Sequence, residues 1–305
     1  MGRIAQWLER FSYKEDVDGP NPSTPTKCLL GFFNILFMIV FTAIVPHPPL
    51  VVPEIGKGQE KKLKNTHEAM QKLSKELAET EPDVIIFITP HSLVYPDRFN
   101  ICAMDQLVGS FSQFGVENYS WRGKNDLRLA CELAEASERN DVPTILYKNE
   151  DTGFELDQGV TIPLYFFDQQ LENAYKVIPI GYSHLSRVQH YQFGQTITEI
   201  CEKSNKRVAV IATGDLSHRL DCPAPEGFEY EGKAFDGEIK ELLELGDEAS
   251  IMQMDEDMVE NAGECGYNSI VVLLGVLSGK EFQTDIYSYE APFGVGHMVA
   301  NLKTK

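Results

Sequence analysis

The sequence has 305 residues, of which 43% are hydrophobic, so it can bury a full core, and we expect one large domain rather than two modest ones. Its 27 Lys and Arg residues are outnumbered by 46 Asp and Glu residues, which gives a formal net charge of −19. Because this charge repels phosphate backbones and anionic lipid headgroups, it argues against nucleic-acid and membrane-surface partners.

The N-terminal part of the chain differs in character from the rest. Residues 1–27 mix charges with a Gly-Pro-Asn-Pro-Ser-Thr-Pro run, and we predict that residues 1–37 form a poorly ordered extension to a domain at 38–305. The apolar run at 28–45 is long enough to raise the alternative of a membrane span. We favour a buried strand from residue 38, because that part is β-branched and ends in Pro-His-Pro-Pro.

Beyond residue 37, short apolar runs alternate with longer amphipathic stretches, a pattern that predicts an α/β domain with a largely parallel central sheet flanked by helices. The expected strands are residues 38–45, 84–89, 177–181 and 208–213. The expected helices are residues 56–81, 125–140, 188–205 and 232–245, and one that begins near residue 266 and runs through 270–277.

The six cysteines are scattered and include no Cys-x-x-Cys pair. Their density is too low for a disulfide-stapled secreted domain, and the closely spaced ligand pairs of structural zinc are absent. A reducing compartment fits this usage, so we expect a cytoplasmic protein.

A histidine follows each expected strand within a few residues: His47, His91, His184 and His218. Ligand sites of open α/β sheets lie beyond the carboxyl ends of the strands, so we expect these side chains at one edge. We interpret His184 as a residue of the catalytic pocket rather than a metal ligand. His297, near the end of the chain, is interpreted as structural.

Two of these histidines are candidate metal ligands. His47 lies in Val-Pro-His-Pro-Pro and His91 in Thr-Pro-His-Ser, where proline stiffens the turn that presents the imidazole. Two imidazoles and one carboxylate would leave open positions for substrate and dioxygen, and Glu264, just before an apolar helix, is the candidate carboxylate. Its neighbour Cys265 is an alternative donor that would favour zinc or copper.

His218 is the candidate acid/base, because an imidazole near its working pKa suits proton transfer at neutral pH. Asp215 or Ser217, in the same Gly-Asp-Leu-Ser-His segment, could orient its ring. A serine hydrolase is disfavoured because Ser217 lacks the Gly-x-Ser-x-Gly elbow. A zinc hydrolase is disfavoured because its two histidines usually share one helix in His-Glu-x-x-His.

Taken in order, Val-Pro-His-Pro-Pro, Thr-Pro-His-Ser, Gly-Asp-Leu-Ser-His and Glu-Cys-Gly resemble the class III extradiol dioxygenase superfamily. The resemblance covers roughly residues 38–300 and is closest to the dioxygenase-like proteins of the AmmeMemoRadiSam group and to Memo-like relatives. It implies that non-haem iron(II), held by His47, His91 and Glu264, opens the ring of a small catechol-like diol with dioxygen. It also implies that His218 is the acid/base. A homo-oligomer or a small partner subunit would be consistent with the resemblance.

The sequence departs from this family at Leu-Asp-Gln-Gly, where many relatives carry a pocket histidine before the glycine and this chain has Gln158. Glutamine can form hydrogen bonds but cannot shuttle a proton at neutral pH. Memo-like relatives also have a cysteine at or beside the carboxylate position, as Cys265 is here. A catalytically silent metal-binding or interaction protein is therefore the alternative function.

Overall fold

The computed structural model describes residues 38–148, 154–221 and 225–305, and the predicted extension at 1–37 lies outside these ranges. The strands are β1 (Ile39–Val45), β2 (Val84–Thr89), β3 (Phe99–Cys102), β4 (Gln106–Phe111), β5 (Val116–Lys124), β6 (Thr144–Tyr147), β7 (Phe154–Glu155), β8 (Lys176–Gly181), β9 (Val208–Thr213), β10 (Phe282–Glu290) and β11 (His297–Thr304). The α-helices are α2 (Pro53–Gly56), α3 (Lys64–Glu79), α4 (Leu127–Arg139), α5 (Gln158–Phe167), α6 (Arg187–Ser204), α7 (Tyr230–Leu245), α8 (Glu248–Met252), α9 (Glu256–Ala262) and α10 (Tyr267–Val276).

The strands form one mixed sheet in the order β10-β11-β1-β9-β2-β8-β5-β4-β7, with β3 paired to β8 and β6. Its centre is parallel, because β1 pairs with β9, β9 with β2, and β2 with β8 in parallel register. The antiparallel strands β11 and β10 extend it beyond β1. The predicted α/β fold is confirmed, and the four strand ends that precede the candidate histidines lie side by side.

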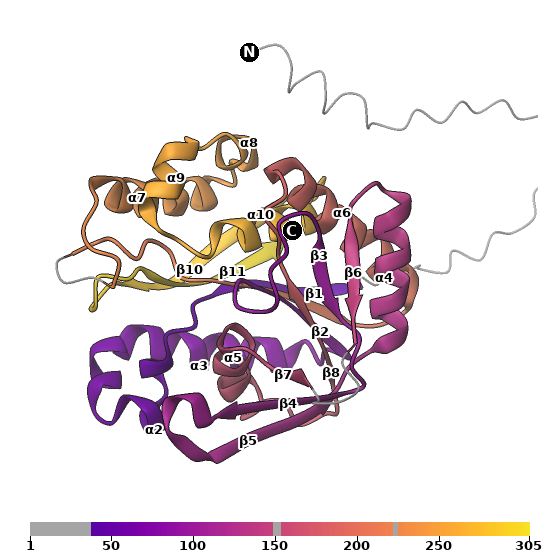
Figure 1. Ribbon diagram of the computed structural model, residues 1–305, viewed down its shortest axis with the longest axis horizontal. Helices are drawn as coiled ribbons and strands as arrows, with labels where there is room; N and C mark the ends of the chain where they lie inside the picture. The colour runs from indigo at the N-terminus through magenta and orange to yellow at the C-terminus, as the bar shows by residue number, and fades with distance from the viewer. Residues whose placement is uncertain (1–37, 149–153, 222–224) are drawn as a thin grey trace, which may run out of the picture. The chain divides into compact units, whose positions relative to one another are not determined.

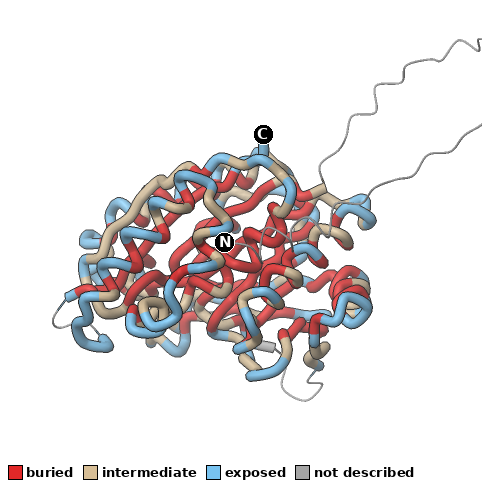
Figure 2. The backbone as a smooth tube through the Cα atoms, turned by 90° about the horizontal axis from the view of Figure 1, so that it is seen from above, coloured by how far each residue is buried: buried red, intermediate tan, exposed pale blue. Residues whose placement is uncertain are grey.

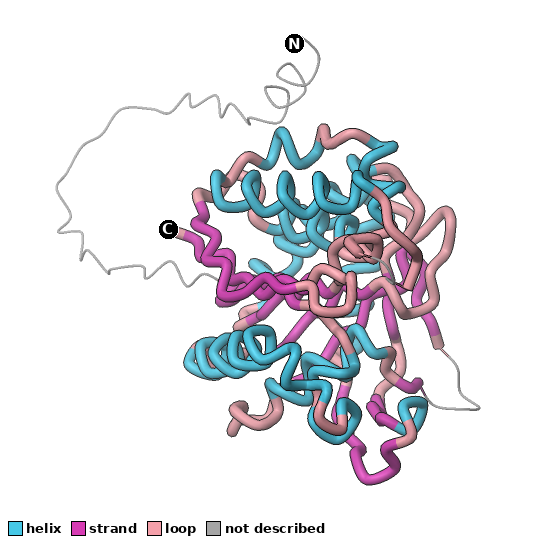
Figure 3. Tube along the Cα trace, turned by 90° about the vertical axis from the view of Figure 1, so that its left-hand side faces the viewer, coloured by secondary structure: helices cyan, strands magenta, loops and turns pink. Residues whose placement is uncertain are grey.

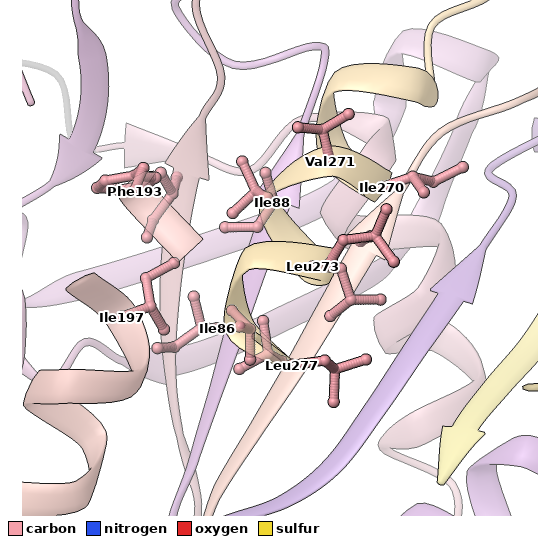
Figure 4. Packing of buried hydrophobic residues seen from close by; sticks show 14 of the residues in the cluster. Ile86, Ile88, Phe193, Ile197, Ile270, Val271, Leu273 and Leu277 are labelled. Atoms are coloured by element: carbon pink, nitrogen blue, oxygen red, sulfur yellow. The ribbon is translucent and has the colours of Figure 1, made fainter. Parts of the chain in front are cut away.

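Helices cover both faces of the sheet (Figures 1 and 3). The central strands β2 and β9 are buried along their whole length, as expected for parallel strands with helices on either side. Successive residues of β2 therefore enter different cores: Ile86 and Ile88 join the cluster beneath α6 and α10, whereas Ile85 and Phe87 join the one beneath α3 and α5. Figure 4 shows Ile86 and Ile88 beside Leu273 of α10, and Figure 2 shows the buried interior.

Most of the predicted helices agree with the structure to within a few residues. The segments predicted at 125–140, 188–205 and 232–245 correspond to α4, α6 and α7, and the helix predicted from residue 266 corresponds to α10. The start of the helix predicted at 56–81 is wrong. Lys57 and Gly58 have φ values of 50° and 104°, so right-handed helix cannot continue through them, and α3 begins at Lys64.

Several elements carry weak sequence signals and were not predicted. Helix α5 contains Pro163 in its interior, a residue that ordinarily indicates the end of a helix. Most residues of β5 are exposed and most of β10 are partly exposed, and neither strand shows a clean alternation of buried and exposed residues. Their pairing partners, rather than their local pattern, determine their conformation.

The apolar run that raised the alternative of a membrane span continues into β1, which lies inside the sheet. Among the residues that the structure describes, no helix is both long enough and apolar enough to cross a membrane.

Helices α6 and α10 pack closely against each other, with a glycine of each helix at the contact. A Cβ atom at Gly194 of α6 would lie 2.0 Å from the Val272 carbonyl oxygen of α10, and one at Gly275 of α10 would lie 2.0 Å from the Tyr191 carbonyl oxygen. The two helix backbones can therefore pack at this distance only without side chains at these positions.

We predict that Gly194→Ala lowers the free energy of unfolding by about 1–3 kcal/mol, because the helices must separate to admit the methyl group. Urea denaturation measures the change. Gly237→Ala is the matched control, because a Cβ at this exposed site on α7 would meet no atom within 4 Å. This control should stabilise the protein by up to about 1 kcal/mol. If the free energy of unfolding changed by the same sign and size in both variants, the close packing of α6 against α10 would be contradicted.

Candidate functional site

His47 and His91 meet at the carboxyl edge of the sheet. His47 follows β1 and is 1% exposed, with Pro46 and Pro48 on either side of it, and His91 follows β2 and lies at the surface. Their Nε2 atoms are 2.8 Å apart, and the two rings stand at 81° to each other. The structure therefore brings together two imidazole nitrogens that the sequence separates by 44 residues.

Cys265 reaches the same place because two glycines allow a close backbone approach. A Cβ at Gly214, just after β9, would lie 2.1 Å from the Cα of Gly266. Beside this contact, the Cys265 N–H donates to the Asp215 carbonyl oxygen at 3.2 Å, and the Asp215 N–H donates to Cys265 Sγ at 3.2 Å. The thiol is thus fixed against the loop that follows β9.

The Sγ atom of Cys265 lies 3.7 Å from His47 Nε2 and 3.8 Å from His218 Nε2. The donor atoms of His47, His91 and Cys265 all lie within 4.8 Å of one another, and so do those of Asp215, His218 and Cys265. Cys265 belongs to both groups. Five potential ligands thus converge at one edge of the sheet.

The first group fits a transition metal ion in spacing and in chemistry. A nitrogen about 2.1 Å and a sulfur about 2.3 Å from one tetrahedral ion stand about 3.6 Å apart, close to the observed 3.7 Å between His47 and Cys265. The 2.8 Å between the Nε2 atoms of His47 and His91 is also a hydrogen-bond distance. The other ring nitrogen of His47, Nδ1, is buried and has no hydrogen-bond partner among the described residues.

Asp215 holds the His47 loop in place. Its Oδ1 accepts a hydrogen bond from the His47 backbone N–H at 3.1 Å and lies 3.2 Å from His297 Nδ1. Burial alone would raise the pKa of Asp215, but His47 and His297 hold it well below its ordinary value. Burial lowers the pKa of His47 to about 4 although Asp215 opposes this, so the ring is neutral at pH 7, as a metal ligand must be.

His297 was interpreted as structural, and the structure places it 2% exposed beside the site. Its contribution could not be foreseen, because the strand that carries it, β11, pairs with β1 from the far end of the chain. The expectation that Asp215 orients His218 differs from the observed contacts, which join Asp215 to His47 and His297.

His218 contacts the same thiol as His47. Its backbone N–H donates to the Ala262 carbonyl oxygen at 3.2 Å, and its Nδ1 lies 3.6 Å from Glu226 Oε1. The ring therefore has Cys265 at one nitrogen and a carboxylate at the other. Sequence reasoning missed Glu226, since no local pattern distinguishes it from the many other acidic residues.

The remaining candidates lie outside both donor groups. The Glu264 carboxylate accepts a hydrogen bond from the Tyr267 N–H at 2.5 Å, at the start of α10, and burial raises its pKa to about 7. His184 is exposed and borders a cavity of about 410 Å³ together with Glu264 and Tyr267. Gln158 is the first residue of α5 and is partly exposed. The prediction that Glu264 binds a metal stays a prediction.

Residues 41–300 match the family of the catalytic LigB subunit of aromatic ring-opening dioxygenase. The chain belongs to this family. Family membership covers all of the residues that converge at the site, from His47 to His297.

Two curated relatives can be compared with this LigB-family chain. Protein CA_C1420 of Clostridium acetobutylicum is 38% identical over 265 residues, covering 85% of this chain and 56% of its own length. The chain thus spans little more than half of that relative. The 3,4-dihydroxyphenylacetate 2,3-dioxygenase of Escherichia coli is 24% identical over 240 residues, covering 72% of this chain and 82% of its own.

Among solved structures, the uncharacterized protein JW3007 from Escherichia coli K12 superposes with a TM-score of 0.58. Its sequence identity is 15%, and the match covers 86% of this chain and 98% of that protein. At this identity the likeness concerns the fold alone. The LigB match and the distant dioxygenase relative relate this chain to the aromatic ring-opening dioxygenases at the level of the family.

We predict that Asp215→Ala lowers the free energy of unfolding by roughly 3–5 kcal/mol, because it leaves the buried His47 N–H and His297 ring without their carboxylate. Urea denaturation at pH 7 measures the loss. Asp97→Ala, which removes an exposed carboxylate paired with Arg98, is the control and should leave the urea midpoint unchanged. Equal midpoints for the two variants would show that Asp215 does not hold the site together.

Proposed function

We propose that this chain is a metal-dependent dioxygenase that opens the ring of a small catechol-like aromatic diol, with iron(II) as its ion. One observation carries the proposal: the Nε2 atoms of His47 and His91 lie 2.8 Å apart at the carboxyl edge of the sheet, and His218 lies in the adjoining donor group. Membership of the LigB family and the likeness to an Escherichia coli catechol-type dioxygenase support the reaction class.

Bound iron(II) would supply adjacent coordination positions for the diol and dioxygen and a path for electrons between them. His47 and His91 would hold the ion through nitrogens that are neutral at pH 7, since burial lowers the pKa of both rings. The third protein ligand comes from the adjacent pair Glu264 and Cys265. Cys265 is the better placed, because the Glu264 carboxylate is bonded to the Tyr267 N–H.

His218 is the acid/base in this proposal. Its Nε2 faces the donor group, where it would accept a proton from a hydroxyl of the diol and later return it to the ring-opened product. Glu226, 3.6 Å from Nδ1, would stabilise the protonated imidazolium between these two transfers. His218 would thus transfer the proton, and Glu226 would stabilise the resulting charge.

A second candidate function is a catalytically silent metal-binding or interaction protein of the AmmeMemoRadiSam or Memo-like kind. The specific observation in its favour is that a thiol, not a carboxylate, lies in the donor group with His47 and His91. A thiolate donor favours zinc or copper over iron(II). Gln158 also replaces a pocket histidine with a side chain that cannot shuttle a proton.

Ring opening is tested by reconstituting the full chain anaerobically with iron(II), adding a panel of catechols, and following oxygen uptake and the yellow ring-opened product. We predict uptake on at least one diol, and a rate reduced about 10²- to 10⁴-fold in His218→Gln with iron content unchanged. His67→Gln is the control, because His67 lies on α3 and bonds to the Val51 carbonyl oxygen. It should retain the full rate.

Iron bound stoichiometrically with no uptake on any diol would contradict ring opening and favour the silent metal-binding protein. If His218→Gln and His67→Gln lost the same fraction of the rate of oxygen uptake, the role of His218 as acid/base would be contradicted.

A further inference from the structure

A buried carboxylate outside the donor groups connects helix α5 to the loop of His91. Asp157 is the residue before α5, and its Oδ1 accepts hydrogen bonds from the Gly159 N–H and from Thr89 Oγ1, both at 2.7 Å. Thr89 is the last residue of β2, and its Oγ1 in turn accepts from the backbone N–H of His91 at 3.3 Å. A continuous chain of hydrogen bonds therefore runs from α5 to His91.

Helix α5 rests directly on the ends of two central strands. A Cβ at Gly159 would lie 2.3 Å from the hydroxyl oxygen of Thr89 at the end of β2, and 2.8 Å from that of Thr213 at the end of β9. Only glycine fits here. The first turn of the helix, which presents Gln158, is thus placed against the strands that precede His91 and Asp215.

Helix capping alone does not account for Asp157. An ordinary capping side chain needs only one oxygen. Here Asp157 Oδ2 is buried and has no hydrogen-bond partner within the described ranges, and the same is true of Thr213 Oγ1. Burial raises the pKa of Asp157 to about 6 although its hydrogen bonds oppose this. Such a costly arrangement indicates that the link to Thr89 has a role of its own.

We propose that Asp157 is a positioning residue that, acting through the Thr89 hydroxyl, fixes the backbone of His91 relative to Gln158 at the start of α5. This inference rests on the proposed function, in which His91 is a metal ligand. The two threonines allow a matched test, because both end central strands beneath Gly159 but only the Thr89 hydroxyl is hydrogen-bonded to Asp157 and His91.

The first readout is cobalt(II) titration of the full chain, with the visible absorption spectrum reporting coordination. We expect Thr89→Val to bind cobalt about 10-fold more weakly with an altered spectrum, as changes just outside a ligand shell do. Asp157→Ala should behave like Thr89→Val. Asp157→Asn, which keeps an oxygen acceptor for Thr89 and Gly159, should be close to the wild type, and so should Thr213→Val.

The second readout needs no metal: hydrogen–deuterium exchange of residues 89–93 in the metal-free chain. Faster exchange in Thr89→Val than in Thr213→Val supports the inference. Equal exchange in the two threonine variants overturns it, even if the wild type binds metal and cleaves diols. The two proposals can also fail separately. If the wild type binds no cobalt and Thr89→Val still exchanges faster than Thr213→Val, the metal site of the proposed function is overturned and the positioning of His91 remains supported.

If Asp157→Ala does not fold, the two threonine variants still decide the matter, because each removes one hydroxyl group and keeps a side chain of similar shape. Thermal melting of both variants establishes that they are folded. Cobalt affinity equally weakened in both would overturn the specific role of the Asp157–Thr89 link.

Discussion

The contact between Gly214 and Gly266 joins the two parts of the chain on which the site depends. A Cβ at Gly214 would lie 2.1 Å from the Cα of Gly266, and one at Gly266 would lie 3.1 Å from the Asp215 carbonyl oxygen, so the turn after β9 and the turn before α10 can lie this close only with glycine at position 214. The reciprocal bonds between Asp215 and Cys265 form at this contact. His47, which follows the neighbouring strand β1, then lies within reach of both the Asp215 carboxylate and the Cys265 thiol.

Electrostatics at the site follow from burial more than from the net charge of −19. Burial lowers the pKa of His47, and the charge of Asp215 is retained because two histidines surround it. The neutral His47 ring beside the buried Asp215 carboxylate leaves a nitrogen lone pair free at the site. A cation is the ligand that such an arrangement attracts, which links the fold to the proposed chemistry.

Sequence reasoning predicted the parts of the fold that local pattern determines. The β-branched runs predicted the four central strands. The prolines before His47 and His91 predicted that β1 and β2 end just before these histidines. Because parallel strands share one carboxyl edge, the meeting of His47, His91 and His218 could be expected. The interruption at Lys57 and Gly58 could not, since it depends on left-handed backbone that amphipathic spacing does not reveal.

The different contacts of Glu264 and Cys265 could not be predicted from the sequence, for a physical reason. Neighbouring residues in a turn point in different directions, and the direction depends on which backbone groups are free nearby. Here the first N–H of α10 binds the Glu264 carboxylate, while the Asp215 N–H binds the thiol. His297 likewise contributes through a contact with Asp215, 82 residues away, which no local pattern records.

The most direct test of this account is X-ray absorption spectroscopy of the zinc-loaded full chain. The account predicts one sulfur ligand at about 2.3 Å and imidazole nitrogens at about 2.0–2.1 Å from the ion, with the sulfur lost in Cys265→Ala and retained in Cys131→Ala. A shell of nitrogen and oxygen alone in the wild type would contradict it, because it would exclude Cys265 as a ligand.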